Sequence, residues 1–116
     1  MMISDFQQKP IYIKGMRLYS IVIHSFNAKT PKYLKDQASR AALSVILNFA
    51  EGYGRDSQKE KRHMYVTARA SLNETIACFD ILKLHVEIPG DTVIDFESLA
   101  IELQKMLSAL INSQRQ

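Results

Sequence analysis

The sequence predicts an all-α protein, an antiparallel up-down-up-down four-helix bundle. Apolar residues recur at three- and four-residue steps in four stretches, short connections rich in Pro, Gly and Asp separate them, and a sustained alternating pattern is absent apart from an ambiguous run around Tyr19–Ile23. A length of 116 residues suits one domain. We therefore expect a single domain, 1–116, with helices at about 10–26, 32–53, 58–87 and 95–113.

The first predicted helix begins at Pro10, because the first turn does not need the missing N–H. Gly15 is expected to weaken this helix. Pro31 biases Thr30 away from helical geometry, so a connector precedes residue 32. The apolar stripe expected to face the core is Tyr12, Met16, Tyr19, Val22, Ile23 and Phe26.

The second predicted helix is apolar on more than one side. Leu43, Ile46 and Leu47 project away from its main face, which predicts a second partner such as another copy of the chain. Gly52 and Gly54 are expected to end the helix, since glycine adopts the left-handed conformation cheaply. The main face is formed by Leu34, Ala38, Ala41, Ala42, Val45 and Phe49.

Ser57 and Glu60 have the spacing of a capping box, so the third helix should start near residue 58. Pro89 and Gly90 are expected to stop it, and Asp95 to cap the fourth helix. The third stripe is Met64, Ala68, Leu72, Thr75, Phe79, Leu82 and Val86. The fourth is Phe96, Leu99, Leu103, Met106 and Leu110, widened by Leu107 and Ile111.

Composition indicates an ordinary folded protein, with 47% hydrophobic and 23% charged residues. Cys78, the single cysteine, excludes an intramolecular disulfide and is expected to be a small buried hydrophobe. Neither a signal peptide nor an apolar run of about 20 residues is apparent. We expect a cytoplasmic protein.

Candidate catalytic groups are scattered along the chain, so we expect no enzyme, no cofactor and no metal site. His24, His63 and His85 lack zinc-site spacing, and the Gly52–Gly54 turn lacks the Lys and Ser/Thr of a phosphate-binding loop. Several polar residues in the second and third helices are instead expected to form a buried structural cluster that fixes register and assembly. They are Gln37, Arg40, Asn48, Glu51, Asn73 and Glu74.

Charge is divided unevenly along the chain. Residues 1–69 hold 12 Lys and Arg against 5 Asp and Glu, and residues 70–116 hold 3 against 7. Grouped cations can displace counterions from a nucleic-acid backbone, although a solvated charged surface explains the same residues. The candidate nucleic-acid-binding residues are Arg55, Lys59, Arg62 and Arg69, from the turn and one side of the third helix, with Lys61 close by, and Lys29, Lys32 and Lys35, which cluster at the connector before the second helix.

Residues 34–55 also carry a family resemblance. The residues that carry it are Leu34, Gln37, Arg40, Ala41, Ala42, Ser44, Asn48, Ala50, Glu51, Gly52, Gly54 and Arg55, followed by Ser57, Lys59, Glu60, Ala68, Ser71, Leu72 and Glu74. This pattern resembles the four-helix bundle proteins, or 23S rRNA-intervening sequence proteins, of bacteria, which are related to the accessory variability protein of diversity-generating retroelements.

The resemblance implies a non-enzymatic homo-oligomer, a pentamer in the related retroelement protein, that binds RNA or DNA through repeated basic patches. The first alternative is a retroelement accessory protein that binds a reverse transcriptase and its template RNA, which a neighbouring reverse transcriptase gene would favour. The second alternative is a purely structural, self-assembling protein whose charge division serves assembly alone.

Overall fold

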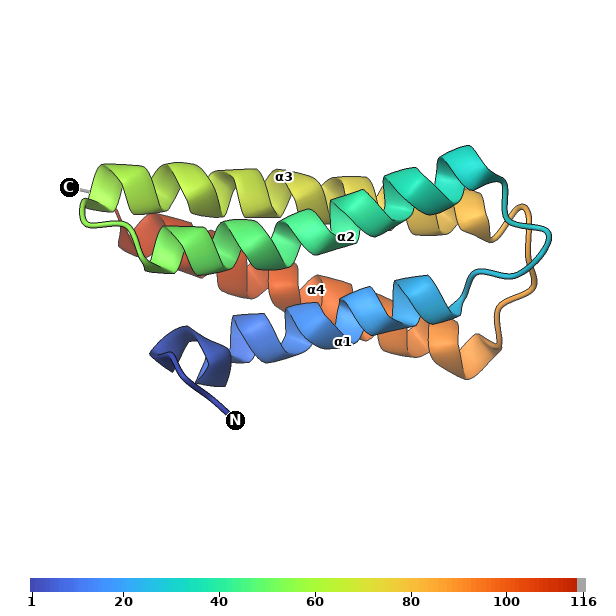
Figure 1. Cartoon of the computed structure of the whole chain (residues 1–116), viewed down its shortest axis with the longest axis horizontal. Helices are drawn as coiled ribbons and strands as arrows, with labels where there is room; N and C mark the ends of the chain where they lie inside the picture. Colours follow the sequence, from blue (N-terminus) through green and yellow to red (C-terminus); the bar gives the residue numbers. More distant parts are fainter. Residues whose placement is uncertain (115–116) are drawn as a thin grey trace.

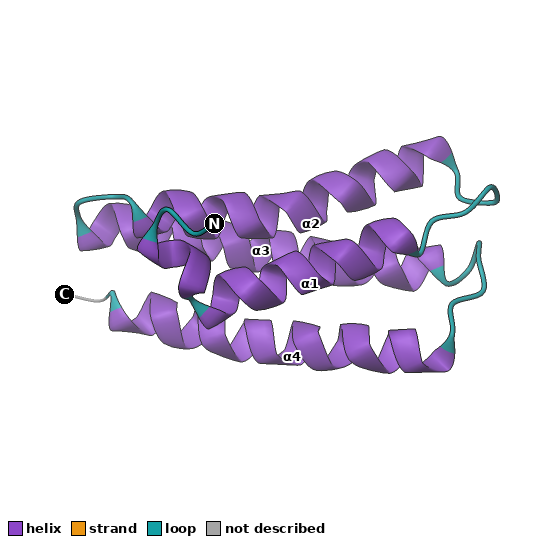
Figure 2. Cartoon of the chain, turned by 60° about the horizontal axis from the view of Figure 1, so that its bottom comes forward, coloured by secondary structure: helices purple, strands orange, loops and turns teal. Residues whose placement is uncertain are grey.

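A computed structural model describes residues 1–114 as four long helices preceded by one turn of 3₁₀-helix, η1 (Asp5–Gln8). The long helices are α1 (Pro10–His24), α2 (Lys32–Tyr53), α3 (Gln58–Leu82) and α4 (Gly90–Ser113). Each runs opposite to the one before it (Figure 1), and α1 and α3 both pack against α2 and α4. Among residues 1–114 there is no strand (Figure 2). The predicted all-α four-helix bundle is confirmed.

The core forms where the predicted faces of α2 and α3 meet. All six residues of the main α2 face are buried, and so are those of the α3 stripe, except Met64, which is half-buried. Cys78 is buried as expected, and desolvation raises the pKa of its thiol, as Glu74 also does to a smaller extent. In α4 the core face is centred on Leu103, Leu107 and Ile111.

The predicted face of α1 was correct at Val22, and Tyr12, Tyr19 and Phe26 pack against the core while partly exposed, but the centre of the buried face lies one position away. Its buried residues are Ile11, Gly15, Leu18 and Val22, whereas Met16 is 46% exposed. Both sets have helical spacing, so periodicity alone does not choose between them. Gly15 suits the observed face, because a Cβ at this position would make a tight contact of 3.3 Å with Cγ1 of Ile46. The glycine that we expected only to weaken α1 therefore lets α1 approach α2 closely.

Helix boundaries differ from the prediction mainly around Pro89. Helix α3 ends at Leu82, not near 87, and residues 83–86 continue as hydrogen-bonded turns. Helix α4 begins at Gly90, so Pro89 is its N-cap and Asp95 lies inside the helix. The Pro–Gly pair starts a helix here, because the residues at a helix N-terminus need no backbone N–H donor. Helix α1 ends at His24 instead of 26.

The bundle has two distinct ends. The α1–α2 and α3–α4 connections lie at one end, and the α2–α3 turn lies at the other, beside η1 (Figures 1 and 2). The longest dimension is 46 Å. In the part of the chain that the structure describes, each helix is too short or too polar to cross a membrane.

Candidate nucleic-acid interface

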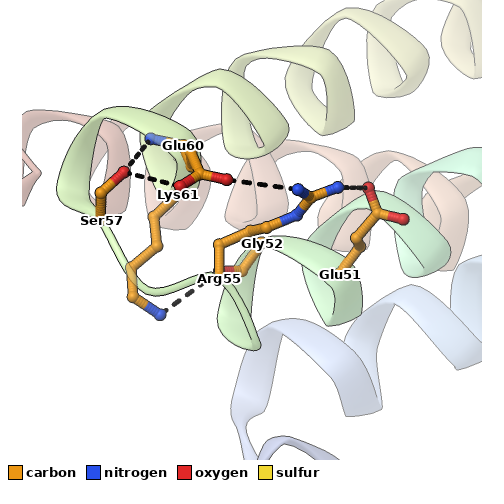
Figure 3. Close-up of polar contacts among 6 residues, drawn as sticks. All are labelled: Glu51, Gly52, Arg55, Ser57, Glu60 and Lys61. Carbon is orange, nitrogen blue, oxygen red and sulfur yellow. Dashed lines mark hydrogen bonds and ion pairs between the residues drawn. The ribbon is translucent and has the colours of Figure 1, made fainter.

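Ser57 fixes the start of α3 at the α2–α3 turn (Figure 3). Its Oγ accepts a hydrogen bond from the Glu60 backbone N–H at 3.1 Å, which satisfies one of the donors that the first turn leaves free. The Glu60 carboxylate accepts from the Ser57 hydroxyl at 3.1 Å, not from its backbone N–H as a complete capping box requires. The predicted start of α3 is confirmed. The capping box is incomplete, because the Glu60 side chain bonds the Ser57 hydroxyl and not the Ser57 backbone N–H.

Lys61 closes the end of α2. Its Nζ donates to the carbonyl oxygens of Tyr53, at 2.7 Å, and Gly52, at 3.3 Å. These carbonyls belong to the last turn of α2, where a cation also offsets the negative end of the helix dipole. The same ammonium lies 5.6 Å from the centroid of the Tyr53 ring.

The glycines of the turn do not adopt the left-handed conformation that we predicted for them, and no residue among 1–114 has a positive φ. Gly52 lies inside α2 and is buried. A Cβ on Gly52 would lie 2.7 Å from Cε1 of Tyr65 and 2.9 Å from Cβ of Met64. Gly52 is therefore required by the close approach of α2 to α3, and Gly54 ends α2 with an ordinary φ of −87°.

Arg55 is placed between two carboxylates. Its guanidinium nitrogens lie 2.9 Å from Glu51 and 3.3 Å from Glu60 (Figure 3). The hydrogen bond to Glu51, more than that to Glu60, raises the pKa of Arg55. Two anions thus balance the charge of Arg55. Together with Lys61, it holds the turn in place.

The other three predicted cations near the turn lie along one side of α3. Lys59, Arg62 and Arg69 are spaced by three and seven residues, a spacing that keeps them on one face of the helix. They extend over about 15 Å at 1.5 Å per residue. Arg69 donates to Oγ of Ser108 at 3.3 Å. Within residues 1–114, none of the three forms an ion pair. We call Lys59, Arg62 and Arg69 the α3 basic stripe.

The connector lysines lie at the opposite end of the bundle (Figure 1). Lys29 and Lys35 are exposed, whereas Lys32 pairs with Asp36 at 2.7 Å. One chain therefore presents two separate basic groups and does not join them into one patch.

The polar residues predicted to form one cluster are spread along the bundle. Gln37 donates to the Glu74 carboxylate, and Asn48 donates to the carbonyl and hydroxyl of Ser44, both at 2.8 Å. Asn73 accepts from Gln104 at 3.4 Å, Glu51 pairs with Arg55, and Arg40 is exposed. Asn73 and Glu74 are 15 or more residues into α3, more than 20 Å from its start, so they cannot lie beside the turn. The contact between α2 and α3 that sequence reasoning missed is Ser44 Oγ with Ser71 Oγ, at 2.8 Å.

The three histidines are also apart. His24 closes α1, with its Nδ1 2.7 Å from the Ser20 carbonyl oxygen, and His63 and His85 lie on other segments. Across residues 1–114, no group of three or more His, Cys, Asp or Glu side chains is placed to hold a metal ion.

The fold and this surface define the class: a four-helix-bundle protein with a basic stripe beside its α2–α3 turn. Residues 8–109 match the sequence model of a family described as 23S rRNA-intervening sequence protein. The match covers most of the chain, and the protein belongs to this family. No curated protein matches the chain.

Proposed function

We propose that this protein is a non-enzymatic, oligomeric nucleic-acid-binding protein that contacts the phosphate backbone through the α3 basic stripe. The observation that carries this proposal is that Lys59, Arg62 and Arg69 lie together without ion-pair partners among the described residues. Membership of a family described by a ribosomal RNA intervening sequence supports RNA as the first ligand to test.

The stripe is suited to phosphate contacts and not to base recognition. Lysine and arginine that neutralise phosphates release condensed counterions, which gives an affinity that falls steeply with salt. Phosphate contacts position a protein on nucleic acid without reading its sequence. Arg55 and Lys61 contribute less, because their polar groups already have partners in the turn.

Repetition in an oligomer would compensate for the small size of the stripe. Several weak contacts on one polyanion add through effective concentration when subunits are joined. Leu43 and Leu47 support an assembly, because they lie one turn apart on α2 and are 41% and 56% exposed. A ring of five subunits follows from the resemblance alone.

The test is fluorescence anisotropy with a labelled RNA hairpin and a duplex DNA of equal length, across a series of salt concentrations. The variant Lys59→Ala with Arg62→Ala should bind more weakly, and its plot of log affinity against log salt should be shallower by about 0.9 for each duplex phosphate that the variant no longer neutralises. Both side chains lie on the outside of α3, so circular dichroism should show an unchanged helix content.

The matched control is Lys83→Ala with Lys105→Ala, which removes the same charge from the other end of α3 and from α4. It should leave the affinity and salt slope close to those of the unmodified protein. Absence of binding to either nucleic acid at low salt would refute the proposal. Equal weakening of binding in the two variants would show that affinity depends on net charge and not on the α3 basic stripe.

A further inference from the structure

A cavity of about 840 Å³ opens at the end of the bundle that holds the α2–α3 turn. Its apolar wall comes from α1, α2 and α4 through Ile11, Phe49, Met106 and Leu110. Small-molecule sites are typically concave, of about 300–1,000 Å³, and mainly apolar with a few converging polar groups. This cavity has the size and lining of such a site.

Tyr65 is the buried aromatic residue with a polar group in the lining of the cavity. Its side chain is 2% exposed and stacks with Phe49 at a centroid distance of 6.0 Å. The hydroxyl has no hydrogen-bond partner among residues 1–114, yet none of their fully enclosed side-chain polar atoms lacks a partner. Tyr65 is one of the residues that line the cavity. Desolvation raises the pKa of Tyr65, so the hydroxyl remains a donor at neutral pH.

Two lysines make the cavity positive. Lys9 and Lys61 line it, and no carboxylate side chain of the described residues does. Lys61 uses two backbone carbonyls as partners and retains a third N–H. Lys9 pairs with Asp5 at 3.6 Å and lies 5.8 Å from the centroid of the Tyr53 ring, and the Tyr53 hydroxyl also donates to Asp5. An apolar space lined by two ammonium groups, with Asp5 held outside the lining by Lys9 and Tyr53, is complementary to a ligand that has an apolar body and an acidic group.

We propose that this cavity binds a small organic carboxylate, with its apolar body against Phe49, Met106 and Leu110 and its carboxylate accepting from Lys61 or Lys9 and from Tyr65. A nucleotide fits the lining less well, because its sugar and base carry polar groups that the aliphatic wall would leave without partners. The proposal is independent of nucleic-acid binding by the α3 basic stripe.

The test is isothermal titration calorimetry with decanoate below its micelle concentration, compared with decan-1-ol. Decanoate should bind at one site per chain and at least about tenfold more tightly than the alcohol, since hydrogen bonds to a charged group are worth more than neutral ones. Tyr65→Phe, which keeps the stacked ring, and Lys61→Met should each weaken decanoate about tenfold. Lys9→Met provides a second charge variant if Lys61→Met does not fold.

The control is Lys59→Met, which removes a nearby charge that does not line the cavity. It should bind decanoate like the unmodified protein and bind RNA more weakly. Tyr65→Phe should bind decanoate more weakly and RNA like the unmodified protein. No decanoate binding by the folded protein, or unchanged binding in Tyr65→Phe and both lysine variants, would overturn the proposal. Exclusion of decanoate by contact between subunits, seen as binding only after the oligomer dissociates, would also overturn it.

Discussion

Gly52 and Gly54 are two residues apart, yet a methyl group would meet very different surroundings at the two positions. At Gly52 it would lie 2.7 Å from Tyr65 and 2.9 Å from Met64, closer than non-bonded carbons allow. At Gly54 the nearest atoms are the carbonyl oxygens of Glu51, at 3.7 Å, and Ala50, at 3.9 Å. Only the first glycine is required by packing.

Gly52→Ala should therefore lower the free energy of unfolding by about 1–3 kcal/mol, because the Tyr65 ring and α3 must shift to accommodate the methyl group. Gly54→Ala should be neutral or stabilise by up to about 1 kcal/mol, since its φ suits alanine and the unfolded chain loses freedom. Urea denaturation at one protein concentration compares them. Equal effects of the two substitutions would show that packing against Tyr65 is not what requires Gly52.

At the scale of the element, hydrogen bonds at the helix ends decide where each helix begins and stops. Ser57 caps α3 through its side chain, and Lys61 satisfies the last carbonyls of α2. Both ends of the α2–α3 connection are thus fixed by side chains within a few residues of the turn. This local control explains why the start of α3 at residue 58 was predicted correctly, whereas the end of α2 at Tyr53 was predicted for a reason, left-handed glycines, that the structure does not show.

Ser57→Ala should destabilise the protein by about 1 kcal/mol, because the Glu60 N–H loses its acceptor. The matched control is Ser39→Ala, the same chemical change inside α2, where alanine is the better helix former. Its effect should be neutral or slightly stabilising. Thermal and urea unfolding followed by circular dichroism measure both, and a Ser57→Ala variant as stable as the control would show that the cap is energetically unimportant.

At the scale of the whole molecule, one chain leaves apolar surface uncovered. Leu43 and Leu47 point outward from α2, whereas Ile46 is buried against α1, so only two of the three residues predicted to need a second partner remain available. Lys14 and Glu102, 2.7 Å apart, form an ion pair between α1 and α4. This pair neutralises one positive charge of residues 1–69 with one negative charge of residues 70–116 inside the same chain.

Leu43→Glu with Leu47→Glu should convert the proposed oligomer to monomers without unfolding it, because both side chains are exposed in the single chain and charges at their positions would oppose association. Sedimentation velocity measures the mass. The control Ile101→Glu changes a residue of α4 that is 51% exposed and should leave the mass unchanged. A monomeric unmodified protein would contradict the proposed assembly and leave each basic stripe to act alone.

Features of the fold were predicted correctly where a single sequence pattern was enough to define them. The α2 face was found because six apolar or small residues share it, and the start of α3 because Ser57 and Glu60 stand in register. The prediction was only partly right on α1, where two stripes had equal spacing. It failed at Pro89, where a Pro–Gly pair is compatible with either the end or the beginning of a helix. Of the predicted polar residues only Gln37 and Glu74 meet across α2 and α3, and the set does not gather into one cluster because separation along a helix translates directly into distance.

Four helices, their alternating direction and most of the core could be predicted from the sequence, because helical periodicity, capping residues and short connections are local properties. Which cations remain available depends on the folded turn. Arg55 and Lys61 lie close to Lys59 and Arg62 in sequence, but the folded turn gives the first pair partners and leaves the second pair without ion-pair partners among the described residues. The cavity beside Tyr65 could not be predicted from the sequence either. It forms between the ends of the four helices, and no local sequence pattern indicates how far apart these ends lie.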